Sequence, residues 1–219
     1  IERFRSPTSL DGRGHPKRRP GRVVDEVGWL LGVMLTIQVI PGPGAGVLDV
    51  LVGRTEAVRQ QARRSYEAAW RWSVSRRAGL VVTAIEGGPA EQTWDNVGRA
   101  LSAAGKLVEE GGAIVVCCDL AGEPGPAVQR LAAIGQRHEA LEWIRKERPV
   151  DALPATILAG ALDRATVYLL SRLDPSLLED LEIAPVAGAD ELVRLIARHE
   201  SCILLPNAPH AMVTLDNDD

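Results

Sequence analysis

The sequence predicts an α/β fold, in which an open, mostly parallel sheet carries helices on both faces and a β-hairpin precedes the sheet. Short apolar runs of β-type residues alternate along the chain with segments whose apolar residues recur at helical spacing. The runs at residues 167–170 and 202–205 are wholly apolar, as in strands that are buried on both faces. Strands separated by helices pair in parallel, with the helices covering both faces.

The hairpin is predicted from two apolar runs and the turn between them. Residues 33–40 and 47–52 are strand-like, and residues 42–46 read Gly-Pro-Gly-Ala-Gly, which is typical of a turn. A loop-like region over 1–22 and a short helix over 23–31 are expected before them. The glycines of the turn superficially resemble a dinucleotide fingerprint, but an apolar strand follows where a helix would be needed, so we expect no pyrophosphate site.

The middle of the chain alternates between helix and strand. Residues 56–72 place Val58 and Ala62 on or near one helical stripe, which predicts a helix. The predicted elements that follow are a strand over 80–85, a helix over 93–108 and a strand over 113–118, which comes after a glycine pair.

Prolines mark helix starts in the second half of the chain. A helix is expected after the Pro-Gly-Pro run of 124–126, and Pro154 fits the first turn of a helix that reaches Ala161, because its missing N–H costs nothing there. Further helices are expected over 138–147 and, between the two wholly apolar strands, over 189–198.

Composition excludes several classes of protein. The 219 residues are 46% hydrophobic and 25% charged, which is typical of a globular domain, and the net charge of −4 argues against nucleic-acid binding. There is no apolar run of 18 residues and no legible signal peptide, so we expect no membrane partner. The odd set of Cys117, Cys118 and Cys202 lacks C-x-x-C spacing, which argues against a disulfide framework or zinc site and favours the cytoplasm.

The segment over residues 81–101, VVTAIEGGPAEQTWDNVGRAL, is where we predict a ligand site. A β-type run meets the Gly87-Gly88 turn and then a helix start. Ligands gather at the carboxyl edge of strands in open α/β sheets, and the next helix directs unpaired N–H groups at an anion. No G-x-x-x-x-G-K-[ST] loop occurs, which disfavours a nucleotide site.

Three polar residues of this helix are candidate ligand contacts. Asn96 and Arg99 stand three residues apart and are expected to point the same way, with Gln92 one turn earlier. An amide and a guanidinium beside a glycine turn can bind a carboxylate. The competing interpretation, of nearly equal weight, makes Arg99 a solvated helix residue and Asn96 a first-turn polar residue.

The histidines do not indicate a metal site. The chain has four histidines, His15, His138, His199 and His210. No two of them show the i, i+4 spacing that a metal site on one helix uses. His210 follows a buried strand and could face the same edge as the glycine turn, but we interpret it as an ordinary loop histidine.

Several segments in this order resemble the carboxy-terminal lobe of the nickel-pincer-dependent lactate racemase family. The resemblance covers residues 22–215 and rests on DEVGWLLGVMLTIQVI, DVLVGRTEAVRQQARRSYEAAW, GLVVTAIEGGPAEQTWDNVGRALSAAGKLVEEGGAIVVCCDL, ATILAGAL and CILLPNAPHAMVTL. It implies that the chain is the substrate-side lobe of an isomerase that racemises or epimerises a 2-hydroxy acid. The cofactor implied is the nickel-pincer nucleotide.

The resemblance also implies a second lobe. In the family, an amino-terminal lobe supplies the lysine tether, a histidine ligand and the acid/base histidines, and none of these has a counterpart here. The chain begins with Ile1 and not methionine, so we expect a truncated or processed N-terminus, with the cofactor lobe in the same gene or on a separate chain. Residues 1–22 are then a basic arm or the remnant of an interlobe linker, residues 23–215 form the α/β domain, and residues 216–219 form an acidic tail. The isolated chain is expected to be inactive.

The substrate-binding residues implied by the resemblance are Asn96 and Arg99, which fall on a family glutamine and lysine, with Gln92, Gly87 and Gly88 beside them. No catalytic residue and no metal ligand is expected in this lobe. A family tryptophan falls on Leu153, so either the substrate differs from lactate or the lobe has lost catalysis. The alternative function is a non-catalytic α/β binding or interaction module with a degenerate site, and association into a homo-oligomer is left open by the many tryptophans.

Overall fold

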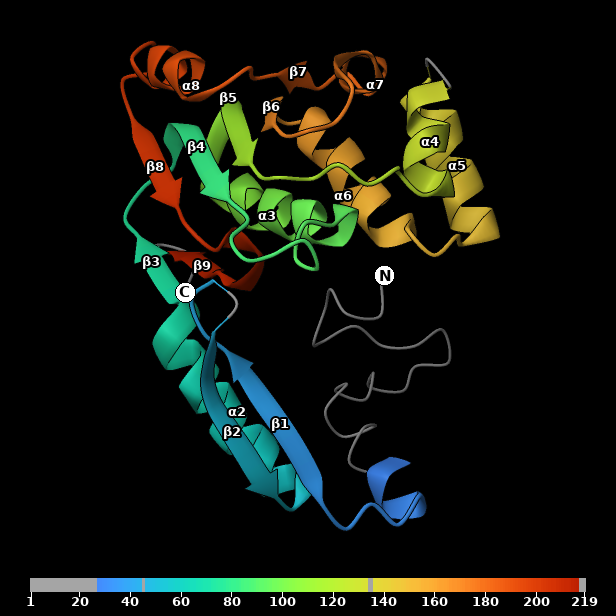
Figure 1. Ribbon diagram of the computed structural model, residues 1–219, viewed down its shortest axis with the longest axis vertical. Coiled ribbons are helices and arrows are strands. Elements are labelled where there is room, and N and C mark those ends of the chain that lie inside the picture. Colours follow the sequence, from blue (N-terminus) through green and yellow to red (C-terminus); the bar gives the residue numbers. More distant parts are fainter. Residues whose placement is uncertain (1–26, 45, 134–135, 217–219) are drawn as a thin grey trace, which may run out of the picture. The chain divides into compact units, whose positions relative to one another are not determined.

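The computed structural model describes residues 27–44, 46–133 and 136–216 (Figure 1). In chain order its elements are β1 (Thr36–Pro41), β2 (Val47–Gly53), α2 (Thr55–Trp70), β3 (Arg71–Val74), β4 (Ala78–Ala84), α3 (Trp94–Leu107), β5 (Val108–Cys117), α4 (Pro126–Ala133), α5 (Arg137–Glu147), α6 (Ala152–Leu162), β6 (Thr166–Leu170), α7 (Pro175–Asp180), β7 (Ala184–Pro185), α8 (Ala189–Ile196), β8 (Cys202–Leu205), the 3-10 turn η2 (Ala208–His210) and β9 (Met212–Leu215). The helix expected over 23–31 lies partly outside the described residues, which are helical at 27–30.

The structure confirms the predicted α/β class. Five parallel strands form one sheet in the order β7-β6-β5-β4-β8, and β1 and β2 pair as an antiparallel hairpin. The chain forms two compact units: a hairpin unit of β1, β2 and most of α2, and a sheet unit that contains the rest from Trp70 onwards. The range 23–215 thus contains both units. No described helix is long and apolar enough to cross a membrane.

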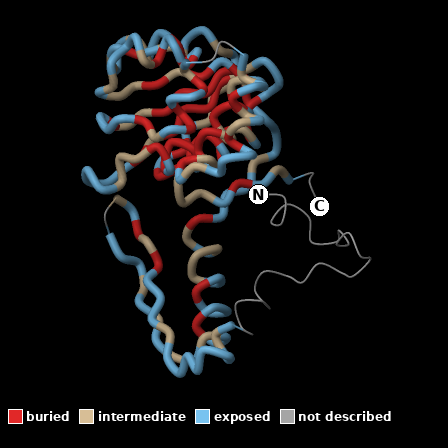
Figure 2. The backbone as a smooth tube through the Cα atoms, turned by 90° about the vertical axis from the view of Figure 1, so that its right-hand side faces the viewer, coloured by how far each residue is buried: buried red, intermediate tan, exposed pale blue. Residues whose placement is uncertain are grey.

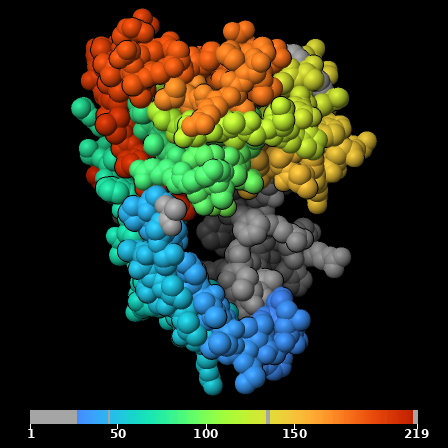
Figure 3. All heavy atoms as spheres, in the orientation of Figure 1, coloured from blue at the N-terminus to red at the C-terminus, as the bar shows by residue number. Residues whose placement is uncertain are grey.

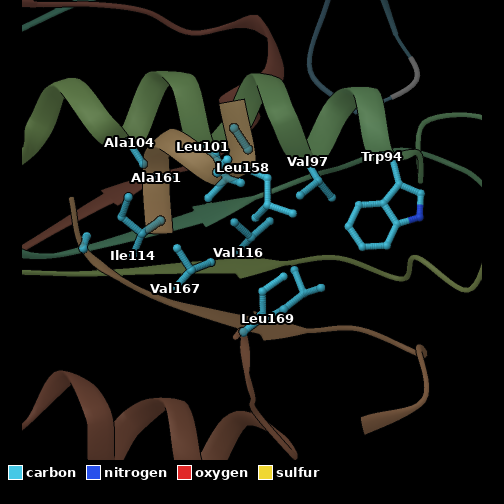
Figure 4. Packing of buried hydrophobic residues seen from close by; sticks show 14 of the residues in the cluster. Trp94, Val97, Leu101, Ala104, Ile114, Val116, Leu158, Ala161, Val167 and Leu169 are labelled. Atoms are coloured by element: carbon cyan, nitrogen blue, oxygen red, sulfur yellow. The ribbon is translucent and has the colours of Figure 1, made fainter. Parts of the chain in front are cut away.

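The central strands are apolar on both faces because helices cover both. On β5, Ile114 and Val116 belong to the large buried cluster with α3 and α6, whereas Ala113 and Val115 belong to a smaller cluster with Leu195 of α8. Figure 4 shows the first of these faces, and Figure 2 shows that most buried residues lie in the sheet unit. This alternation at period two explains why unbroken apolar runs mark these strands.

Two local contacts fix how the helices are placed around the sheet. α3 begins after Thr93, whose hydroxyl accepts a hydrogen bond from the Asn96 backbone amide at 3.2 Å. Farther along α3, a Cβ added to Gly98 would lie 3.0 Å from the Cα of Pro154, so α3 and α6 approach each other closely. The backbone of α3 therefore reaches α6 only because residue 98 is a glycine.

The order of strands creates a topological switch beside β4. From β4 the chain proceeds outward through β5, β6 and β7, and it then returns to place β8 on the other side of β4. α3 and α8 lie on opposite faces of the sheet (Figure 1). The carboxyl ends of β4 and β8 are therefore the point at which open α/β sheets bind ligands.

Some elements were not expected from the sequence. β3 and β9 pair in parallel as a separate two-stranded sheet, with Arg71 opposite Met212. Helix α7 and the short edge strand β7 were also missed, and the helix predicted over 56–72 ends at Trp70 because β3 begins there.

Candidate functional site

Two loops meet at the switch point. The β4–α3 loop runs over residues 85–93, and the β8–β9 loop includes η2, which packs on α3. The amide Nδ2 of Asn207 donates a hydrogen bond to Oε2 of Glu86 at 2.6 Å. Asn207 is almost completely buried and has a φ of 50°, in the left-handed region. The bond therefore links two loops whose bonded residues are 121 positions apart in the sequence.

The glycine pair shapes the first loop. Gly87 has a φ of +100°, and a Cβ there would lie 2.7 Å from Cγ of Glu91, so a side chain is excluded both by conformation and by space. Gly88 has open space around it. Gly87 thus brings the loop close to Glu91, whereas nothing in the structure requires glycine at position 88.

The predicted amides hold the loop together. Asn96 is buried, and its Nδ2 donates to the backbone oxygen of Glu91 at 2.8 Å and to Oε2 of Glu91 at 3.2 Å. Gln92 donates to the backbone oxygen of Ile85 at 3.2 Å and accepts from the Asp119 amide at 2.9 Å. Both side chains therefore make their hydrogen bonds within the chain, and Gln92 links the ends of β4 and β5.

Arg99 has a different environment from Asn96. It is exposed, and its guanidinium makes no hydrogen bond and no ion pair with any described residue. The spacing of three residues on α3 thus separates a buried amide from an exposed cation.

His210 lies close enough to Arg99 for the two to interact electrostatically. Its ring centroid is 5.2 Å from that of Trp70, and the ring is half-buried. Burial lowers the pKa of His210, the Glu91 carboxylate raises it, and the Arg99 guanidinium lowers it. Arg99, Glu91 and His210 therefore interact electrostatically at the switch point, and Trp70 lies against the His210 ring.

The structure thus brings together the predicted residues Gly87, Gly88, Gln92, Asn96 and Arg99 in one loop and helix start, and their role in binding stays a prediction. Sequence analysis missed Glu86, Asn207 and Trp70, and it set His210 aside. The sequence signal was the PNAPH loop directly after a wholly apolar strand. What was lacking was the strand order, which places β8 beside β4.

The described residues do not form a metal site. Among them, no three His, Cys, Asp or Glu side chains are grouped so that they could hold a metal ion. Cys117, Cys118 and Cys202 are free thiols, and burial raises the pKa of Cys118 to about 11. The family tryptophan position, Leu153, is half exposed.

Comparison with known proteins gives a fold likeness. No protein-family model matches this chain, and no curated protein does either. The lactate racemase apoprotein from Thermoanaerobacterium thermosaccharolyticum is similar in structure with a TM-score of 0.75 and 12% identity, over 93% of this chain and 50% of the racemase chain. A protein from Thermotoga maritima is similar with a TM-score of 0.62 and 11% identity, over 90% of this chain and 52% of its own.

These likenesses establish that the chain has a lactate racemase-like fold. The chain spans about half the length of either solved structure. At this level of identity the likeness is one of architecture.

Proposed function

We propose that this chain is the substrate-side lobe of a racemase or epimerase of 2-hydroxy acids, and that the cofactor lobe is supplied by further chain of the same gene or by a separate chain. The observation that carries the proposal is an exposed guanidinium, without a partner among the described residues, at the switch point of a lactate racemase-like fold. Ligands of open α/β sheets bind at this position, and a guanidinium is suited to a carboxylate.

Arg99 is the residue that binds the substrate carboxylate in this proposal. Its planar fork makes two parallel hydrogen bonds to a carboxylate. His210, which lies beside it, contributes a ring nitrogen to the same acid. Asn96 is a positioning residue, because its amide holds Glu91, the carboxylate that interacts with His210.

The nickel-pincer nucleotide does not fit the residues that the structure describes. The described residues offer no metal-ligand set, so no step of the reaction is assigned through the cofactor here. We place its tether, its ligand and the acid/base groups in the cofactor lobe, and we expect the isolated chain to be inactive. Three free thiols are consistent with a reducing cytoplasm.

The test is an assay of the complete gene product with D- and L-lactate and with larger 2-hydroxy acids, followed by chiral chromatography. Arg99→Ala removes a charge-assisted contact that contributes about 1.5–3 kcal/mol, so kcat/KM should fall by roughly 10- to 150-fold. The matched control is Arg194→Ala on α8, an exposed arginine on the opposite face of the sheet. Wild-type kinetics in the Arg99 variant would exclude the assigned role.

One observation favours a second function, a non-catalytic binding module for small acids. Both predicted amides, Gln92 and Asn96, make their hydrogen bonds within the lobe, which leaves fewer groups to orient a substrate. Isothermal titration of the 219-residue chain with lactate measures binding alone. Binding that depends on Arg99, together with no nickel adduct in the mass spectrum of the complete gene product and no turnover, would favour the module over the enzyme.

A further inference from the structure

The outer face of the β1–β2 hairpin is an exposed apolar ladder. In the register of the two strands, Ile37 lies opposite Val52 and Val39 lies opposite Val50. These side chains are 66%, 58%, 53% and 53% exposed in that order. Figure 3 shows the two strands as a continuous surface of the hairpin unit, in blue to cyan. Contiguous exposed apolar patches of this kind mark interaction surfaces.

The opposite face of the hairpin is already covered. Helix α2 packs there through Val58 and Ala62, which are buried, as is Ile40 of β1. Asp49 also belongs to this side, since its Oδ2 accepts a hydrogen bond from the Ser65 hydroxyl at 3.5 Å. Among the described residues, α2 therefore covers one face of the hairpin and nothing covers the other.

The edges of the hairpin are open as well. Among the described residues, β1 pairs only with β2 and β2 only with β1. Asp49 is the single charged residue between Thr36 and Gly53, so no lysine or arginine protects either edge. Natural proteins block exposed edge strands with charges, prolines or covering elements, and an isolated two-stranded hairpin is marginally stable.

We propose that the apolar ladder is the docking surface for the cofactor lobe, which covers the ladder and continues the sheet along at least one edge of the hairpin. The lobe is identified through the proposed function. Its size is indicated by the solved structures, in which as much chain again accompanies the part that matches this protein. A lobe of that size provides the apolar layer and the neighbouring strand that the hairpin lacks.

Exposed apolar side chains also occur in the residues just before β1. Trp29 and Met34 are 81% and 88% exposed. Aromatic residues and methionine are enriched at the centres of protein interfaces. An interface that includes them and the ladder is apolar throughout, as expected for two lobes that stay associated and not for a transient contact.

The test compares the 219-residue chain with the complete gene product by hydrogen exchange. We expect the β1 and β2 amides to exchange at least tenfold more slowly in the complete protein, because strand pairing protects them. The double variant Val39→Thr/Val50→Thr keeps β-branched side chains but places hydroxyls on the ladder. It should reduce this protection and lower the melting temperature of the complete protein, whereas Val193→Thr on exposed α8 should do neither.

Three results would overturn the inference. The first is hairpin exchange that is equally fast in both proteins, and the second is a gene product that ends with these 219 residues and sediments as a monomer. The third is sedimentation of the 219-residue chain as a dimer that the double variant dissociates, which would make a second copy the occupant. Protection without racemase activity would reject the proposed enzyme alone, and activity with an unprotected hairpin would reject this inference alone.

Discussion

The same substitution at two positions of α3 is predicted to have different effects on stability. Gly98→Ala introduces a Cβ that would meet Cα and Cβ of Pro154 at 3.0 and 3.1 Å. Gly105→Ala introduces a Cβ with no heavy atom within 4 Å. Both residues lie inside the same helix, so they share the same change in helix propensity.

The magnitudes follow from two terms. Replacing glycine by alanine in a helix interior contributes about 1 kcal/mol of stability at either site. At Gly98 this gain is opposed by overpacking, which costs about 1–3 kcal/mol. The cost is not relieved by a side-chain rotation, because the contact is with a proline ring and its backbone. We therefore expect Gly105→Ala to stabilise by about 1 kcal/mol and Gly98→Ala to be less stable than Gly105→Ala by about 1–3 kcal/mol.

The assay should report on the sheet unit alone. The hairpin unit is a separate compact unit, so a single denaturation curve can mix two transitions. Native-state hydrogen exchange at Ile114 and Val115 of β5, both fully buried, measures the free energy of opening the sheet. If Gly98→Ala protected these amides as much as Gly105→Ala does, the close approach of α3 and α6 would not be a constraint and the reasoning would be refuted.

Four further predictions concern buried polar and titratable groups. Asp151 accepts hydrogen bonds at 3.0 Å from two backbone amides at the start of α4, so Asp151→Ala should destabilise the sheet unit by about 1–2 kcal/mol in urea titrations, and an unchanged midpoint would contradict this. Because the pKa of Cys118 is raised to about 11, alkylation at pH 8 should be much slower in the native than in the urea-unfolded chain, as measured by mass spectrometry. His210 has a lowered pKa, so the folded protein binds fewer protons than the unfolded chain and its contribution to stability falls as the pH drops through the ordinary histidine value. Arg99→Ala should raise the pKa of His210 in an NMR titration, and a fall would disprove their proximity.

The strands of the central sheet could be predicted because burial on both faces leaves a plain signal. The run over Cys202–Leu205 matches the observed β8 residue for residue, but the expectation of burial on both faces is wrong for this edge strand, where Leu204 is 67% exposed. Helix α3 was also predictable, since Thr93 stands at its start as an N-cap and apolar residues follow at helical spacing. In these cases the local pattern and the tertiary environment favour the same structure.

The small sheet of β3 and β9 could not be predicted because its signal is not local. Three of the four residues of β3 are exposed, and its partner lies about 140 residues away, with Trp72 opposite Val213. Apolar residues near Trp72 continue the helical stripe of the preceding segment, so period alone favours helix. Only pairing with the C-terminal strand makes this segment extended.

The candidate site was predicted from one strand–turn–helix segment, whereas the structure places a second loop beside it. The hydrogen bonds of Gln92 and Asn96 fix the first loop, and the bond between Glu86 and Asn207 fixes the second loop against it. Groups held in this way lose little conformational freedom when a ligand binds, which lowers the entropic cost of association. The amides thus fix the conformation of the first loop, which leads directly into the helix that carries Arg99. For the same reason, the proposed function assigns recognition of the acid to Arg99, whose guanidinium could equally be interpreted from the sequence as an ordinary solvated group.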